Sequence, residues 1–198
     1  MKTASVSSSA LSESDLWAMS VKDLMALFAR SPAPTVPQMD GEFAARLLRQ
    51  PSALAQAIGH VTVNNPLMPG RWLCKAFRPT SADRGRGYNA FAHLGRKVQR
   101  FPMETLIAPS RYDGRPAYTL VYASFRSLCG VVNMVDEVRQ VGPDLYLGVG
   151  TWGFSDAQRR IPLPFVLRGP LSAYAGDIGT HQKSFDVRQA IPALKKKG

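Results

Sequence analysis

The chain has 198 residues, of which 45% are hydrophobic and 20% are charged, a composition typical of folded proteins. This length allows one large domain, or one domain with an appended segment. The longest apolar runs are far shorter than the roughly 18 residues that a membrane-spanning helix needs, so we predict no transmembrane segment. The first residues lack the apolar core of a secretory signal, and we therefore expect a cytoplasmic protein.

The chain is strongly basic, with 25 Lys and Arg residues against 14 Asp and Glu residues and a net charge of +11. Such an excess suits nucleic acid, an anionic membrane surface or an acidic ligand. The basic residues are scattered, apart from a loose cluster between Arg84 and Arg100 and the terminal run Lys195 to Lys197. We find no basic helix, zinc-ligand spacing or aromatic RNA-binding signature, and we therefore disfavour nucleic acid as a partner.

Two cysteines, Cys74 and Cys129, are too few for a disulfide framework. They could pair if the fold brought them together. In a cytoplasmic protein, however, such residues are more often small buried hydrophobic side chains.

The N-terminal part divides into a tail and a helical segment. Residues 1–14 are rich in serine and lack hydrophobic periodicity, which predicts a disordered tail. Ser20 and Asp23 then form a capping pair before apolar residues at helical spacing, and this helix should end near Ser31, ahead of several prolines.

We expect the helical segment to continue over residues 15–60. A second helix is predicted to start at Asp40, where Phe43, Ala44, Leu47 and Leu48 follow at helical spacing. A third begins at Pro51 and ends at Gly59. These amphipathic pieces need an apolar surface to cover.

Residues 61–175 consist of short β-rich runs separated by turns. The runs are GRWLCKAF, METLIA, AYTLVYASF, GVVNMVDEVRQV, DLYLGVGTW and LPFVLRG. Roughly seven short strands with hairpin-length links and no intervening helix predict an antiparallel meander. Closure into an up-and-down β-barrel is favoured because it removes exposed edges. The expected fold is therefore mainly β with N-terminal helices, followed by a C-terminal extension over residues 176–198.

Glycines mark turns and one unusual strand. Asp113-Gly114 and Gly142-Pro143-Asp144 predict tight hairpins. Gly148 and Gly150 strip one face of a strand of its side chains. Strong barrel curvature is the favoured explanation, and close approach of a ligand or helix is the alternative.

The ordered motifs of this region resemble the lipocalin plan, and more closely the bacterial GXWXG family of lipocalin-like proteins of unknown function. The matching segments are MPGRW (Met68 to Trp72), DEVRQV (Asp136 to Val141), LYLGVG (Leu145 to Gly150) and PFVLRG (Pro164 to Gly169). The chain departs from the family at the second glycine of the motif, where Cys74 stands. The resemblance implies that Trp72 plugs one end of the barrel with Arg168 packed over it, so that chemistry belongs at the opposite end.

Some relatives with a similar opening motif hold haem through a late histidine. The histidines here are His60, His93 and His181, and none lies in the late strand motifs. We therefore expect no haem, and the chain has no metal-ligand spacing or dinucleotide fingerprint that predicts another cofactor.

Four polar residues are candidates for acid–base chemistry in the lumen. Tyr118 and Tyr122 share one face of a strand, whereas Asp136 and Glu137 point to opposite faces, so only one of these carboxylates can reach the interior. A carboxylate in an apolar pocket can act as general acid or base, and a tyrosine can donate to a developing enolate. Packing tyrosines and surface ion pairs that involve Asp136, Glu137 or Arg139 are the structural alternative.

Other residues are candidates for ligand contacts. Tyr88 and His93 are expected on a loop, and Arg111 lies in a hairpin whose tip should be exposed to solvent. The predicted ligand-binding set is Tyr88, His93, Arg111, Asn133, Tyr146 and Trp152.

Three functional hypotheses follow. The first is binding of a small, largely apolar molecule, such as one with a carboxylate or phenol. The second is a cofactor-independent cyclase, isomerase or (de)hydratase of secondary metabolism, and the third is a basic interaction module for nucleic acid or a membrane. The N-terminal helices are expected to cap the barrel, act as a lid or pair with a second subunit in a homodimer.

Overall fold

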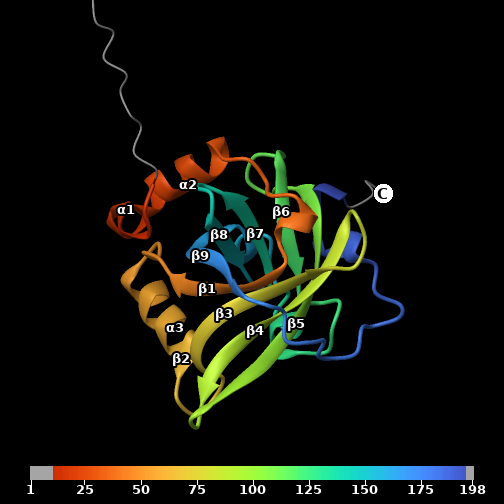
Figure 1. Ribbon diagram of the computed structural model, residues 1–198. Helices are drawn as coiled ribbons and strands as arrows, with labels where there is room; N and C mark the ends of the chain where they lie inside the picture. The colour runs from red at the N-terminus through yellow and green to blue at the C-terminus, as the bar shows by residue number, and fades with distance from the viewer. Residues whose placement is uncertain (1–10, 195–198) are drawn as a thin grey trace, which may run out of the picture.

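The computed structural model describes residues 11–194, and its centre is a closed antiparallel β-barrel (Figure 1). The barrel strands are β1 (Gly41–Leu47), β3 (Gly70–Pro79), β4 (Arg84–His93), β5 (Arg96–Pro109), β6 (Pro116–Val121), β7 (Val135–Gln140), β8 (Leu145–Thr151) and β9 (Leu163–Ser172). Each strand pairs with its neighbours in sequence, and β1 closes the ring by pairing with both β3 and β9. A two-residue strand, β2 (Asn64–Asn65), extends the sheet beside β3. The predicted fold, mainly β with an up-and-down antiparallel barrel, is confirmed.

Short helices surround the barrel. They are α1 (Glu13–Ala18), α2 (Val21–Arg30), η1 (Val36–Gln38), α3 (Ala53–Val63), α4 (Leu128–Val131), η2 (Gln158–Arg160), η3 (Val187–Ala190) and η4 (Pro192–Leu194). The predicted helix after Ser20 is confirmed, because the Ser20 hydroxyl accepts a hydrogen bond from the backbone N–H of Asp23 and the helix ends at Arg30. Within residues 11–194 no helix is long and apolar enough to cross a membrane.

The helix predicted from Asp40 is wrong, because Gly41–Leu47 is strand β1. Phe43 and Leu47 are four residues apart, a spacing that fits one helical face and also fits alternate positions of a strand. Strand pairing favours the extended conformation, since β1 forms hydrogen bonds with both β3 and β9 and so closes the barrel. Phe43 is fully buried in the barrel interior.

The loop predicted around Tyr88 and His93 is also wrong, because Arg84–His93 is strand β4. The glycines of this segment suggested a turn. In the structure they allow close strand pairing: a Cβ added at Gly87 would lie 2.2 Å from the carbonyl oxygen of Ala76 on β3. The strand predicted over residues 130–141 is half right, since its first part belongs to α4 and a turn, and β7 begins at Val135.

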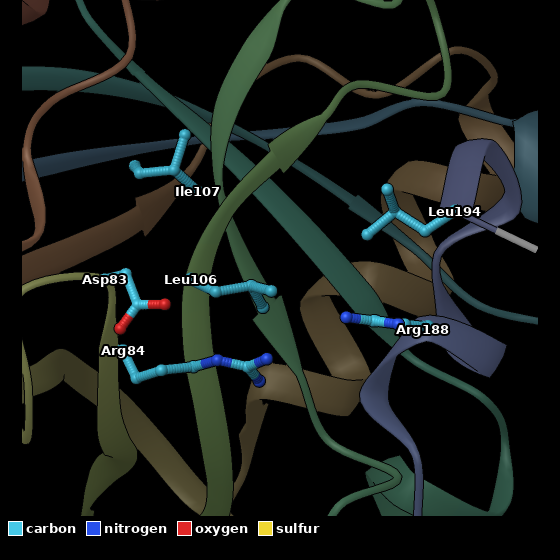
Figure 2. Close-up of a pocket in the computed structure, with 6 residues that line it drawn as sticks. All are labelled: Asp83, Arg84, Leu106, Ile107, Arg188 and Leu194. Carbon is cyan, nitrogen blue, oxygen red and sulfur yellow. The ribbon is translucent and has the colours of Figure 1, made fainter.

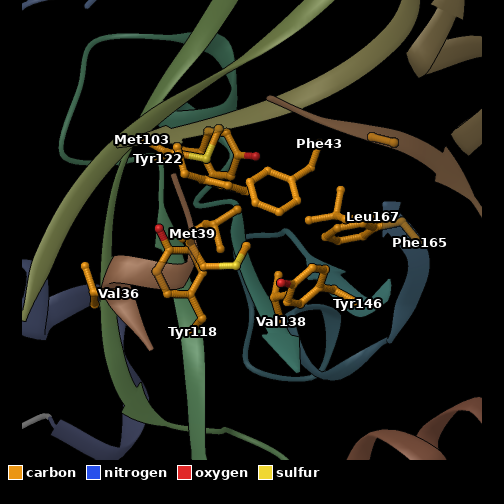
Figure 3. Packing of buried hydrophobic residues seen from close by; sticks show 13 residues of the cluster. Val36, Met39, Phe43, Met103, Tyr118, Tyr122, Val138, Tyr146, Phe165 and Leu167 are labelled. Atoms are coloured by element: carbon orange, nitrogen blue, oxygen red, sulfur yellow. The ribbon is translucent and has the colours of Figure 1, made fainter. Parts of the chain in front are cut away.

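Aromatic and aliphatic side chains fill much of the barrel interior (Figure 3). Phe43, Phe77, Tyr118 and Tyr146 are almost fully buried there. Val36 and Met39, in and beside η1, join the same cluster at the end of the barrel away from Trp72. This end, which the resemblance predicted to be open, is therefore filled by the chain itself.

The N-terminal helices and the C-terminal segment cover the outer faces of the barrel. Leu16, Leu24 and Phe28 of α1 and α2 pack against outward-facing residues of β8 and β9. Val187 and Ile191 cover residues of β5 and β6 in the same way. The predicted tail over residues 1–14 lies largely outside the described residues, although α1 already begins at Glu13, and the Lys195 to Lys197 run lies outside them entirely.

Gly148 has a specific packing role. The Phe165 ring of β9 lies over it, and a Cβ at Gly148 would meet this ring at 2.1 Å. The glycine-lined face of β8 thus makes room for side chains of neighbouring strands inside the barrel.

Candidate functional site

A lysine lies inside the barrel, close to Trp72. The strand pairing places Lys75 of β3 between Phe43 of β1 and Asn89 of β4. Its side chain is only 4% exposed. A charged group in such a place is costly unless it is paired and hydrogen-bonded.

The ammonium of Lys75 has three partners for its three N–H groups. Its Nζ lies 2.8 Å from Asp136 Oδ2, 3.0 Å from Asn89 Oδ1 and 2.5 Å from the Tyr122 hydroxyl. Asp136 is also only 4% exposed, so this is a fully buried ion pair.

Tyr122 joins the members of this cluster. Its hydroxyl donates to Asp136 Oδ2 at 3.0 Å and accepts from Lys75 and from Asn89 Nδ2, the latter at 3.2 Å. Trp72 Nε1 donates to Asn89 Oδ1 at 3.1 Å. We call these five residues, Trp72, Lys75, Asn89, Tyr122 and Asp136, the interior cluster.

Aromatic rings surround the ammonium. Lys75 Nζ lies 5.1 Å from the ring centroids of both Trp72 and Phe165, and 5.3 Å from that of Tyr122. These distances fall in the range of cation–π attraction, which adds to the hydrogen bonds in a site with little water.

The cation beside Trp72 is therefore Lys75, and the contact predicted between Trp72 and Arg168 is wrong. Arg168 lies on the outer face of β9, with 55% of its side chain exposed, and its Nε is 4.0 Å from Glu13 Oε2. The reason is strand parity: Phe165 and Leu167 point inward, so Arg168 points outward.

Burial sets the electrostatics of the cluster. Burial first, and then the charge of Asp136, raise the pKa of Tyr122 well above its usual value, so its hydroxyl stays protonated and can donate. Burial also raises the pKa of the nearby Cys129 to about 12, and burial followed by Glu42 raises that of Cys74 to about 11. Both cysteines are free, as the sequence favoured, and their raised pKa values favour the protonated thiol near neutral pH.

Gly150 leaves room for the carboxylate of Asp136. The two residues are paired on adjacent strands, and a Cβ at Gly150 would lie 3.1 Å from Asp136 Oδ1. The second glycine of the β8 face therefore accommodates the carboxylate, as Gly148 accommodates Phe165.

Partly exposed apolar residues border the cluster. Phe101, Cys129 and Met134, together with Trp72, pack against the edge of the interior core. Phe101 and Asn133 both have a φ of +53°, which asparagine adopts readily but which is strained for the bulky Phe101. Such strain tends to gather at functional sites.

Of the four predicted catalytic residues, the structure brings two together. Asp136 is the carboxylate that faces inward, and it is bonded to Tyr122. Tyr118 also lies inside, but its hydroxyl donates to Thr105 Oγ1 at 2.8 Å and is not among the partners of Lys75. Glu137 lies on the outer face of β7, where it accepts hydrogen bonds from Ser110 and from the backbone N–H of Arg111.

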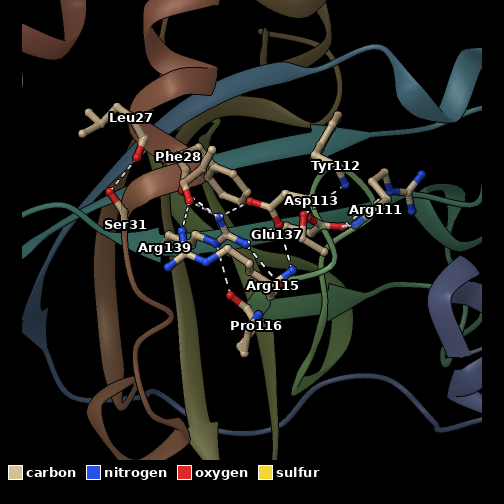
Figure 4. A network of polar contacts seen from close by, with 12 residues as sticks. Leu27, Phe28, Ser31, Arg111, Tyr112, Asp113, Arg115, Pro116, Glu137 and Arg139 are labelled. Atoms are coloured by element: carbon tan, nitrogen blue, oxygen red, sulfur yellow. Dashed lines mark hydrogen bonds and ion pairs between the residues drawn. The ribbon is translucent and has the colours of Figure 1, made fainter.

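The outer face of β7 holds a buried polar network in place of the predicted surface ion pairs (Figure 4). Glu137 Oε1 lies 3.6 Å from Arg111 Nε, and burial raises the pKa of Glu137. Arg139 is fully buried, with both terminal nitrogens 2.7 Å from the carboxylate oxygens of Asp113. It also donates to the carbonyl oxygen of Phe28 at 2.8 Å and lies over the Phe28 ring. This network fastens α2 and the β5–β6 hairpin to the barrel.

The predicted ligand-binding residues are dispersed. Tyr146 lies in the interior core, but Tyr88 is on the outer face, where it donates to Glu42 at 2.9 Å. Asn133 precedes β7, where its Nδ2 lies 3.4 Å from the carbonyl oxygen of Gly153. His93 ends β4, and Trp152 follows β8 with an exposed side chain. Arg111, expected at an exposed tip, is buried beside Glu137.

Sequence reasoning missed Lys75 and Asn89. A signal for Lys75 was present, because it is the single charged residue in the run WLCKAF, which is otherwise apolar. Asn89 could not be found, since the glycines of its segment predict a loop.

Neither of two surface pockets is lined by a residue of the interior cluster. One, of about 340 Å³, is lined by Asp83, Arg84, Leu106, Ile107, Arg188 and Leu194 (Figure 2). It lies between the outer face of the barrel and the C-terminal segment. The other, of about 540 Å³, lies beside α4 and is lined in part by Phe125, Val131 and Phe185.

Comparison with known proteins supports the fold alone. No protein-family model and no curated protein matches the chain. A solved structure of a protein from Thermomonospora curvata is similar, with a TM-score of 0.50 and 15% sequence identity over 76% of this chain and 87% of that chain. This likeness supports the barrel, and the lipocalin and GXWXG resemblance remains an interpretation of motifs.

Proposed function

We propose that the barrel binds a small, largely apolar molecule with one phenol, enol or carboxylate group, held at the interior cluster. The observation that carries this proposal is the ammonium of Lys75, buried among aromatic rings and paired with Asp136. The motif resemblance to lipocalin-like proteins is consistent with the same class of ligand.

The energetics of the buried Lys75–Asp136 pair favour a role in ligand binding over a role in stability. A buried ion pair is often no more stabilising than apolar residues of similar volume, because both charges lose their hydration. In this barrel the pair sits beside partly exposed apolar residues and one strained backbone position, Phe101. We infer that ligands reach it from this end, since Val36 and Met39 fill the other.

Tyr122 indicates the chemistry of the ligand. This internal phenol donates a hydrogen bond to Asp136 while it accepts one from Lys75. A phenol or enol from a ligand can make the same two bonds if the Tyr122 side chain moves aside. A carboxylate can instead accept from Lys75 and from Asn89 Nδ2.

A second function on the same site is acid–base catalysis without a cofactor. The contact between Tyr122 and Asp136 favours it, since a proton donor and a proton acceptor lie 3.0 Å apart beside a fixed cation. Lys75 would stabilise an enolate formed from a bound carbonyl compound, which suits a cyclase, isomerase or (de)hydratase. The proposed set is then Lys75, Asn89, Tyr122 and Asp136, without Tyr118 and Glu137.

The test is a thermal-shift series with three probes of matched chain length: an alkylphenol, an alkyl carboxylate and the corresponding alkane. The phenol or the carboxylate should raise the melting temperature of the wild type, and the alkane should not. Tyr122→Phe should change the probe affinity, while Tyr118→Phe, a control on the same inner face, should not. Equal shifts with all three probes, or equal effects of both variants, would remove the proposed role of the interior cluster.

A further inference from the structure

Exposed hydrophobic side chains are concentrated at one end of the barrel. In an up-and-down barrel alternate connections lie at the same end, so one end carries the segments 48–69, 94–95, 122–134 and 152–162. Fourteen large hydrophobic side chains are exposed in residues 11–194, and eleven of them lie on these four connections. They are Leu54, Ile58, Val61, Leu67, Met68, Leu94, Leu128, Val131, Trp152, Phe154 and Ile161.

Each of the four connections contributes to this surface, which we call the apolar rim. Helix α3 buries none of its side chains, although it is largely apolar. Leu67, at 84%, and Phe154, at 65%, are among the most exposed. The backbone N–H of Gly153 donates to the carbonyl oxygen of Val132, which holds two of the connections side by side. Such a concentration of exposed apolar side chains at one end of a barrel is typical of an interaction site.

The charges of the rim indicate its partner. The four connections contain the arginines Arg49, Arg126, Arg159 and Arg160, and a single acidic residue, Asp156. The connections at the opposite end, 80–83, 110–115 and 141–144, carry three aspartates against two arginines, and none of the exposed large hydrophobic side chains. The rim is thus apolar and positively charged, while the other end is not apolar.

We propose that the apolar rim docks on the surface of an anionic lipid bilayer. Aromatic and aliphatic side chains at loop tips enter the headgroup region, and nearby arginines pair with lipid phosphates. A second copy of this chain fits less well, because a symmetric contact would bring together two surfaces of the same positive charge. Nucleic acid fits less well too, since it offers no apolar phase for leucine, valine and methionine.

The experiment is vesicle co-sedimentation of the full chain with phosphatidylcholine alone and with phosphatidylcholine and phosphatidylglycerol in equal parts. We expect binding to the anionic vesicles that weakens as salt is raised. Trp152→Ser with Phe154→Ser should weaken binding about tenfold or more. The pair Arg126→Gln and Arg160→Gln should weaken it about fivefold for each arginine.

Matched controls lie away from the rim. Trp17→Ser and Lys22→Gln remove an exposed aromatic ring and an exposed charge from α1 and α2, and should leave binding unchanged. Equal losses for rim and control variants would show non-specific attraction and overturn the proposal. So would a lack of binding to the anionic vesicles. In that case a dimer that the Trp152 and Phe154 variant dissociates, as measured by analytical ultracentrifugation, would assign the rim to contact between two copies of the chain.

Discussion

At the level of single residues, Lys75 and Asp136 are the least expected pair in the molecule. Each is buried among apolar side chains, and each is the main compensation for the charge of the other. Because both charges are deprived of water, the loss of one partner and the loss of both should have very different consequences.

We predict that Lys75→Met or Asp136→Leu alone lowers the free energy of unfolding by about 3–5 kcal/mol, because one charge remains buried without its partner. The double variant should recover much of this loss. Urea unfolding of the four proteins measures the coupling energy. Single variants that each cost less than about 1 kcal/mol would show that water reaches the site freely.

Glu137 predicts an unusual pH dependence. Burial raises its pKa above the usual 4.5, so the folded protein holds the proton more tightly than the unfolded chain does. Its contribution to stability is therefore present below pH 4.5 and is lost as the pH rises through the folded pKa. Glu137→Gln removes this titration, so its stability relative to the wild type should improve as the pH rises above 4.5.

Glu104 is a matched control, because its pKa is shifted in the opposite direction. Burial would raise its pKa, but hydrogen bonds with His181, Ser124 and Arg84 outweigh burial and lower it. Its contribution is present above pH 4.5 and is lost as the pH falls through the folded pKa. Chemical unfolding of both variants across pH measures these slopes. Parallel pH profiles for Glu104→Gln and Glu137→Gln would contradict the assignment.

At the level of elements, packing between β8 and β9 depends on glycine. We predict that Gly148→Ala destabilises the protein by about 1–3 kcal/mol, because the new methyl group must displace the Phe165 ring. Phe165→Leu should reduce this cost when it is combined with Gly148→Ala. A thermal unfolding series measures both effects, and additive losses would show that the ring does not lie over the glycine.

Helix α2 is held by Arg139 as well as by its apolar face. Arg139→Lys keeps the charge but loses the planar fork that bonds both the carbonyl oxygen of Phe28 on α2 and the carboxylate of Asp113, and should cost about 2 kcal/mol. In this variant, amide hydrogen exchange should become faster in Val21–Arg30 and change little in the barrel strands. Arg30→Lys, an exposed control on the same helix, should leave the exchange of these amides unchanged. Uniform acceleration across the barrel in Arg139→Lys would contradict a local fastening role.

At the scale of the whole molecule, the barrel could be predicted from sequence because turn residues and the alternation of inward and outward side chains along a strand are local signals. The Asp113-Gly114 and Gly142-Pro143-Asp144 turns occur where they were predicted. Two strands of the barrel were missed, each for a different reason. β1 has an apolar spacing that also fits a helix, and the glycines of β4 resemble a turn but serve close strand contact.

The candidate site could be predicted only in part. Parity showed that one of Asp136 and Glu137 faces inward, but the sequence gives no means to choose between them. The identity of the cation over Trp72 depends on which strands become neighbours and on their register, which are long-range properties. Lys75 and Asp136 are 61 positions apart, and only barrel closure brings them together.

The most direct test of the binding proposal is the ¹⁵Nζ NMR signal of Lys75 during titration with an alkylphenol. A buried, fully hydrogen-bonded ammonium should give a slowly exchanging signal that Lys75→Met removes. We predict that this signal shifts saturably with the probe in the wild type and in Tyr118→Phe. A Lys75 signal that stays unchanged while the probe binds elsewhere, or a probe that does not bind at all, would contradict the account.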